Sequence, residues 1–280
     1  MIKITADSAC DLTLEIIKKM KIELIPYCIL VNNDKYRDGI NIISADLFRY
    51  VEEENKICRT DVINIDEYEK AFAKHAQGFE AVIHIGLSSK LSESFQNAVI
   101  AAQKFNNVHV IDSCNLSTGS GYLVYDAALL AQQGASTAEI CAKLQAEIPL
   151  LETSFIIDQL DYLYRGGRCS GLQNIGAKIL QIKPCIEVID GVMEVGKKYR
   201  GSLERCLEQY IQDRLGGRED LDRSRIFITH TLLYRKDILA QIVEIVKEKN
   251  IFDEVIVSNA GCTISCHCGP GTLGLAFKRK

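Results

Sequence analysis

The segment SCHCGPGTLGLAF, residues 265–277, places a histidine between two cysteines, directly before a Gly-Pro-Gly turn. Three kinds of chemistry suit His267 there: a metal site shared with Cys266 and Cys268, acid–base catalysis, or neutral hydrogen bonding to a ligand. Alternate residues of an extended turn point to opposite sides, so His267 would point away from the side that Cys266 and Cys268 share. The three side chains would then not bind the same ion. The spacing therefore argues against a metal, and no metal site is expected.

Ser92 lies in SSKLSESFQNA, just before a segment with helical periodicity. One interpretation is a nucleophile activated by His267, which would make the protein a hydrolase of lipid-like esters. The other is a helix cap, in which the hydroxyl accepts a hydrogen bond from a free amide of the first turn. The G-x-S-x-G motif of serine hydrolases is absent, and the sequence leaves both interpretations open.

Arginines gather in LDYLYRGGRCSG, which we expect to be a polar loop, and at the end of KKYR. They are Arg165, Arg168 and Arg200. One interpretation is a solvated turn, because arginines are mostly exposed. The other is a docking surface, because the planar guanidinium group suits phosphate or the carboxylates of a partner.

Short apolar strands alternate with helical patterns from the start of the chain, in IKITA, LTLEIIKKM and ELIPYCILV. This alternation predicts an α/β fold with a largely parallel sheet. Two further units, residues 80–105 and 107–134, each read as a strand, a polar turn and a helix. Ligand groups in such folds collect at the carboxyl ends of strands, which is where Ser92 and its neighbours are expected.

A helix is expected to begin at Ser136 or Thr137, and the sequence pattern changes after it. KPCIEVIDGVMEVGKKYR predicts a hairpin around Asp190 and Gly191. Further helices are expected in SLERCLEQYIQDRL and RKDILAQIVEIVKEK, and strands in RIFITH and EVIVSNA. We expect two α/β domains, residues 1–150 and 151–280.

The composition points to a small ligand or a protein partner. A net charge of -4 and a pI near 5.8 predict no general binding to nucleic acid or anionic membranes. The sequence shows neither a basic leader followed by an apolar run nor the roughly 20 apolar residues of a membrane span, so a cytoplasmic location is expected. The 11 cysteines are scattered through apolar segments and are expected to be reduced core residues.

Several motifs, taken in order, resemble the DegV family of fatty-acid-binding proteins. They are Asp7-Ser8, Thr60 ahead of a helix with Tyr68, SSKLSESFQNA, VIDSCNLSTGSG, LDYLYRGGR, IKPCIEVIDG with Arg200, and HCGPGTLG. The family includes the acyl-carrying (FakB) subunit of bacterial fatty acid kinase. The resemblance covers nearly the whole chain and implies two α/β domains of the DegV type, with a lipid tunnel and a head-group site at their junction.

The resemblance also implies residue roles. Thr60, Ser92 and His267 would hold the carboxylate of one long-chain fatty acid, and Ser8 and Asp61 are added to the candidate ligand-binding residues. The protein would not be an enzyme and would need no cofactor besides this bound ligand. It would present the fatty acid to a separate ATP-binding kinase subunit. Arg165, Arg168 and Arg200 would contact that partner, and transient contact with a membrane surface is allowed.

Two departures from the family pattern add acid near the expected site. Thr60-Asp61 stands where Thr-Ser is usual, and Ser92-Glu93-Ser94-Phe95 stands where Ser-Gly-Thr-Tyr is usual. A second carboxylate near the ligand head would repel the first. The alternatives therefore include a carrier of a different apolar ligand, beside the ester hydrolase.

Overall fold

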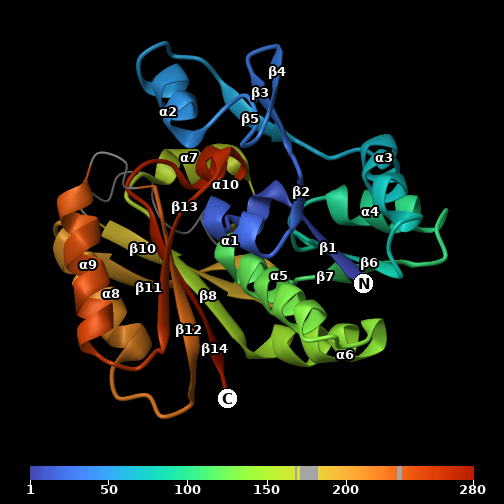
Figure 1. The fold of residues 1–280 in the computed structure, drawn as a ribbon. Helices are drawn as coiled ribbons and strands as arrows, with labels where there is room; N and C mark the ends of the chain where they lie inside the picture. Colours follow the sequence, from blue (N-terminus) through green and yellow to red (C-terminus); the bar gives the residue numbers. More distant parts are fainter. Residues whose placement is uncertain (168, 171–181, 232–234) are drawn as a thin grey trace.

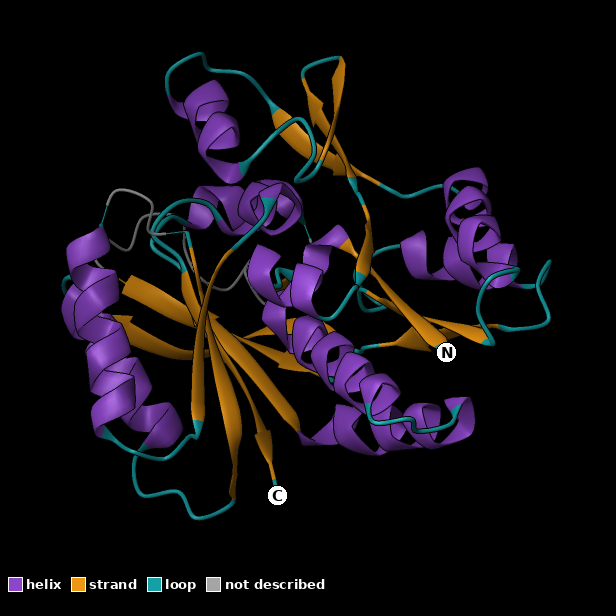
Figure 2. Cartoon of the chain, in the orientation of Figure 1, coloured by secondary structure: helices purple, strands orange, loops and turns teal. Residues whose placement is uncertain are grey.

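The computed structural model describes residues 1–167, 169–170, 182–231 and 235–280. Their strands form three sheets, with helices packed against them (Figures 1 and 2). The α/β class expected from the sequence is confirmed. The ten cysteines whose side chains the structure describes are free thiols and most are buried, as expected.

The first sheet has the strand order β2-β1-β6-β7, and all of its pairs are parallel. Its strands are β1 (Ile2–Asp7), β2 (Glu23–Ile25), β6 (Ala81–Gly86) and β7 (Val108–Asp112). Alternate residues of β6 enter different cores: Ile83 and Ile85 pack toward α5 (Ser117–Gln132), whereas Val82 packs toward α3 (Ile65–Ala76) and α4 (Ser94–Ala102). Burial on both faces explains why this strand is apolar at every position except His84.

The second sheet has the order β13-β12-β14-β8-β10-β11-β9. Its strands are β8 (Leu151–Ile156), β9 (Cys169–Ser170), β10 (Ile182–Ile189), β11 (Val192–Arg200), β12 (Leu221–His230), β13 (Glu254–Asn259) and β14 (Leu273–Arg279). Only the β12–β13 and β9–β11 pairs are parallel, so the expected parallel sheet is confirmed for the first sheet alone. The predicted β10–β11 hairpin is confirmed; Asp190 and Gly191 both have positive φ, as a type I′ turn requires.

Helix α5 lies between the two large sheets, as Figure 1 shows, and contacts strands of both. The opposite face of the second sheet is covered by α8 (Leu203–Leu215) and α9 (Lys236–Glu248), both predicted from their periodicity. Helix α6 (Thr137–Glu147) packs on α5 and is capped by Ser136, as expected. Helix α1 is Leu14–Lys19.

A third, small sheet was not predicted. It has the order β4-β3-β5, formed by β3 (Cys28–Val31), β4 (Asp34–Arg37) and β5 (Cys58–Asp61). The segment ELIPYCILV was expected to be one strand, but it divides at Pro26, which has no N–H to donate to a ladder. With α2 (Ser44–Glu52), the small sheet forms a lobe above α7 (Leu160–Gly166) and α10 (Cys262–Cys268) (Figure 1).

Two expectations about local structure were wrong. The segment around Arg165 was expected to be a loop, yet Leu160–Gly166 is helix α7, because Tyr162 and Leu163 are buried and Gly167 ends the helix with a positive φ. His267 was expected in an extended turn, yet it lies in the last turn of helix α10. The argument from alternation against a metal therefore does not apply to His267.

The strands of the first and third sheets all precede residue 150, and the second sheet begins with β8 at Leu151. Division into domains 1–150 and 151–280 stays a prediction, since α5 packs extensively against both large sheets.

Candidate ligand-binding site

A pocket opens where the small lobe, the first sheet and α10 meet. The pocket is lined by Tyr27, Thr60, Asp61, Val62, Leu87, Leu91, Ser92, Leu116, Met193, Thr263, Ile264, His267 and Cys268. Four of the five predicted ligand-binding residues are in this set, and Ser8 is not.

Thr60 and His267 meet directly although 207 residues separate them in the sequence. Thr60 lies in β5, and its Oγ1 is 3.0 Å from Nε2 of His267. The imidazole fits closely against α7, because a Cβ built on Gly166 would lie only 2.3 Å from Nδ1 of His267. Glycine at position 166 thus allows the helix backbone to approach the ring.

Ser92 lies in the turn between β6 and α4. Its Oγ accepts hydrogen bonds from the Tyr27 hydroxyl at 3.1 Å and from the amide of Ser94 at 3.2 Å, and it donates to Oγ of Ser94 at 3.0 Å. The expected bond to a free amide at the start of α4 is present, but the N-cap of the helix is Glu93 and not Ser92. The Ser92 hydroxyl donates its hydrogen to Ser94, whereas a hydrolase would direct it to His267.

Tyr27 is a pocket residue that sequence reasoning missed. Burial, followed by the nearby charge of Asp7, raises the pKa of its hydroxyl well above the usual range, so the phenol stays a neutral donor. Its backbone amide donates to Oγ of Ser8 at 3.1 Å. Ser8 is thus placed behind Tyr27, where it also donates to Asp38 at 3.1 Å, and not at the pocket wall.

Asp61 and Glu93, the two acidic departures, are placed differently. Asp61 is half-buried and lines the pocket, where its Oδ1 accepts the amide of Val62 at 3.0 Å. Glu93 is exposed at the start of α4 and is not a lining residue. Only Asp61 therefore adds a carboxylate to the pocket wall.

The position of α10 depends on the buried carboxylate of Asp38. It accepts the amides of Cys262 at 2.8 Å and Thr263 at 3.0 Å, and the hydroxyl of Thr263 at 2.5 Å. These bonds satisfy free donors at the start of the helix. Because the seven-residue helix α10 carries His267, Asp38 acts on the pocket by positioning this helix.

A second buried carboxylate, Asp11, holds the turn that leads into α10. It accepts the amide of Gly261 at 2.8 Å and the hydroxyl of Ser117 at 2.6 Å. Burial raises the pKa of Asp11 to about 8, above its ordinary value of 3.8. Neither Asp11 nor Asp38 lines the pocket, and no sequence motif distinguished them as positioning residues.

The predicted partner-contact residues lie outside this pocket. Arg165 is exposed in the last turn of α7 and lines a wider cavity of about 1460 Å³ beside Cys266. Arg200 is exposed at the end of β11. Arg168 lies outside the described residues.

Within the described ranges, no group of three or more His, Cys, Asp or Glu side chains is placed to hold a metal ion. In the same residues, no helix combines the length and apolar character needed to cross a bilayer.

Comparison with known proteins gives a consistent result. A model of the DegV family, described as uncharacterised proteins, matches residues 1–280. A DegV domain-containing protein of Caldanaerobacter subterraneus subsp. tengcongensis is 33% identical over 281 residues, covering 100% of this chain and 99% of that protein. A fatty-acid-binding DegV family protein of Thermus thermophilus matches with a TM-score of 0.91 and 26% identity over 99% of each chain. DegV of Bacillus subtilis, a fatty acid binding protein, matches with a TM-score of 0.85 and 26% identity over 100% of this chain and 99% of that one. The resemblance seen in the motifs is therefore confirmed, and the chain belongs to the DegV family.

Proposed function

We propose that this protein binds one long-chain fatty acid, with the carboxylate held by Thr60, Ser92 and His267. The observation that carries the proposal is the contact of Thr60 with His267 at 3.0 Å on the wall of a pocket that also contains Ser92. The fatty-acid-binding relatives from Thermus thermophilus and Bacillus subtilis support the same ligand class.

The chemistry of the pocket suits such a ligand. A carboxylate that leaves water needs several hydrogen-bond donors, and hydroxyl and imidazole groups supply them. Leucine, isoleucine and methionine side chains also line the pocket: Leu87, Leu91, Leu116, Ile264 and Met193. Burial of a methylene contributes about 0.8 kcal/mol, so the alkyl tail would dominate affinity while the polar residues fix its orientation.

The role that follows is that of a cytoplasmic carrier, not an enzyme. It delivers its fatty acid to a separate ATP-binding kinase subunit, which forms the acyl phosphate. The bonds of Ser92 to Tyr27 and Ser94 favour this role over ester hydrolysis. The exposed Arg165 and Arg200, and with them Arg168, which lies outside the described residues, would contact the kinase subunit.

The test is mass spectrometry of the purified protein under native conditions, followed by denaturation, extraction and identification of the released molecule. One fatty acid per chain is expected, and the Thr60→Val variant should retain less of it. Thr5→Val is the matched control, because Thr5 is buried and hydrogen-bonded to His84, away from the pocket. An empty protein that also takes up no added palmitate would refute the proposal.

A further inference from the structure

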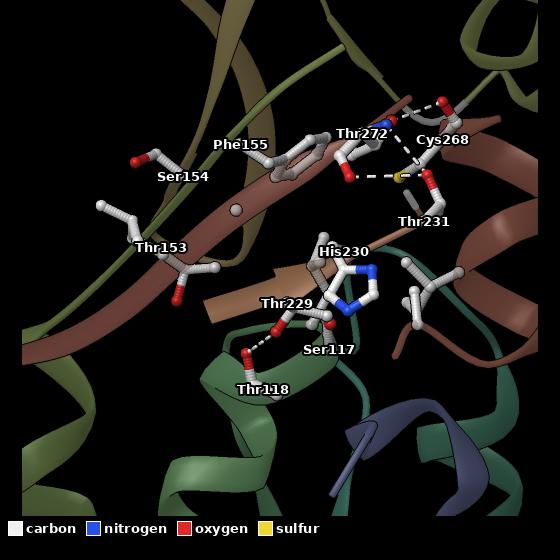
Figure 3. Close-up of a pocket in the computed structure, with 15 residues that line it drawn as sticks. Ser117, Thr118, Thr153, Ser154, Phe155, Thr229, His230, Thr231, Cys268 and Thr272 are labelled. Carbon is white, nitrogen blue, oxygen red and sulfur yellow. Dashed lines mark hydrogen bonds between the residues drawn. The ribbon is translucent and has the colours of Figure 1, made fainter. Parts of the chain in front are cut away.

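A second, smaller cavity adjoins the head-group pocket. The two are adjacent, because Leu116, Ile264 and Cys268 line both. The second cavity, called the inner chamber from here on, lies among the start of α5, strand β8, and the neighbouring ends of β12 and β14 (Figure 3).

The inner chamber is unusually rich in neutral polar side chains. Eight of its fifteen lining residues carry a hydroxyl or an imidazole: Ser117, Thr118, Thr153, Ser154, Thr229, His230, Thr231 and Thr272. No lysine, arginine, aspartate or glutamate is among the lining residues. Burial lowers the pKa of His230 to about 4, so its imidazole is neutral near pH 7. The chamber thus offers hydrogen bonds and no cation.

Several of these hydroxyls already use their hydrogens within the protein. Thr231 donates to the carbonyl of Gly269 at 2.8 Å, and Thr272 donates to the carbonyl of Cys268 at 2.9 Å. Ser117 donates to Asp11. The methyl groups of Thr231 and Thr272 remain for contact with an alkyl chain, so the chamber accepts hydrocarbon as well.

Three other hydroxyl groups can still form hydrogen bonds with a ligand. Thr118 and Thr229 are hydrogen-bonded to each other, and such a pair uses one of its two hydroxyl hydrogens (Figure 3). Oγ1 of Thr153 is buried and has no hydrogen-bond partner among the described atoms. The exposed fractions are only 2% for Thr118, 8% for Thr229 and 5% for Thr153, so bulk water does not satisfy them. A buried polar group without a partner points to a missing ligand or water.

We propose that the inner chamber receives the tail of a fatty acid that carries one neutral hydroxyl group, bound by Thr118, Thr229 and Thr153. A hydroxyl both donates and accepts, which matches a threonine pair with one spare hydrogen and free lone pairs. A second carboxylate on the tail would find no cation in the chamber, which argues against a dicarboxylic acid. This inference rests on the proposed binding of a fatty acid in the adjoining pocket.

The experiment is a competition measured by native mass spectrometry after removal of any bound lipid. The protein is offered stearate together with hydroxystearates whose hydroxyl group moves along the second half of the chain. At least one hydroxylated isomer is expected to bind about fivefold more tightly than stearate, the effect of one neutral hydrogen bond. The isosteric variants Thr118→Val and Thr229→Val should lose this preference and still bind stearate.

Two further variants distinguish a specific loss of the preference for a hydroxyl group from a general effect on folding. Thr229→Ser keeps the hydroxyl and should keep the preference, whereas Thr5→Val removes a buried hydroxyl elsewhere and should not alter it. Stearate binding with no preference for any hydroxylated isomer would overturn the inference and leave the proposed function intact. A preference that survives in both valine variants would overturn it as well. Failure to bind either stearate or any hydroxystearate would instead refute the proposed function.

Discussion

Replacing Gly166 with alanine should weaken fatty-acid binding much more than it destabilises the protein. The new Cβ would lie 2.3 Å from Nδ1 of His267, whereas ordinary contacts begin at 3.4 Å, so the ring must move by about 1 Å or leave its rotamer. A displacement of this size breaks the hydrogen bond between His267 and Thr60. In the proposed complex it would also move His267 away from the ligand carboxylate.

The magnitude follows from the kind of bond that is lost. A hydrogen bond to a charged group contributes about 2 kcal/mol, so affinity should fall roughly thirtyfold. Gly166 ends helix α7 and does not have a positive φ, so alanine suits its backbone and offsets part of the cost of displacing His267. The free energy of unfolding should fall by no more than about 1 kcal/mol. Binding and stability are thus expected to respond differently.

The assay is displacement of a fluorescent fatty acid by palmitate, with thermal unfolding recorded on the same samples. Gly78→Ala is the matched control, because a Cβ at Gly78 would meet nothing within 4 Å. Wild-type affinity in Gly166→Ala would refute the proposed role of His267. A large fall in unfolding temperature would refute the separation of binding from stability.

Three further predictions concern charge. Asp61→Asn should tighten palmitate binding severalfold in the displacement assay, and less so at high salt, because it removes a carboxylate beside the ligand head. The pKa of Asp11 is about 8 in the folded protein and 3.8 ordinarily, so the native state binds the Asp11 proton more tightly than the unfolded state does. The free energy of unfolding should therefore decline as the pH rises between these two values. The Asp11→Asn variant should show a smaller decline, measured by urea unfolding. The Arg200→Glu variant should still bind fatty acid, but acyl phosphate formation with the proposed kinase subunit and ATP should fall at least tenfold, measured by hydroxylamine trapping. The control Arg223→Glu, also at an exposed position, should leave acyl phosphate formation unchanged.

The sequence predicted those elements whose own periodicity determines them. Strand β6 followed by α4 and the hairpin around Asp190 and Gly191 were both recognisable, because buried strands and positive-φ turns leave local signals. The small sheet was missed because Pro26 divides one apolar run between two sheets. Local patterns do not reveal which sheet each part joins.

Helix α10 was missed for a different reason. Seven residues are too few for a stable isolated helix, and its sequence CTISCHC has no amphipathic repeat. The helix exists because Asp38, more than 200 residues earlier, accepts the amides of Cys262 and Thr263. A stabilising contact of this range leaves no local signal.

The candidate site was predictable only in part. Family resemblance indicated Thr60, Ser92 and His267, which the structure brings to one pocket, but it also indicated Ser8, which lies behind Tyr27. Tyr27 was not predicted because it lies between β2 and β3, where the chain passes from the first sheet to the small one. The inner chamber was not predicted because it depends on how α5, β8, β12 and β14 pack.

The acidic residues near the pocket explain why neutral groups are left to meet the ligand. Asp7 accepts the hydroxyl of Tyr68 at 2.7 Å and the amide of Leu87 at 2.9 Å, and Asp11 and Asp38 accept the amides that lead into α10. These three carboxyl groups are buried outside the pocket lining and hold its walls together. Their oxygens accept hydrogen bonds from the protein, so the hydroxyl and imidazole groups at the surface of the pocket remain for an anionic head group. Asp61 is the exception, and the Asp61→Asn variant therefore tests whether the head-group pocket is suited to a full carboxylate.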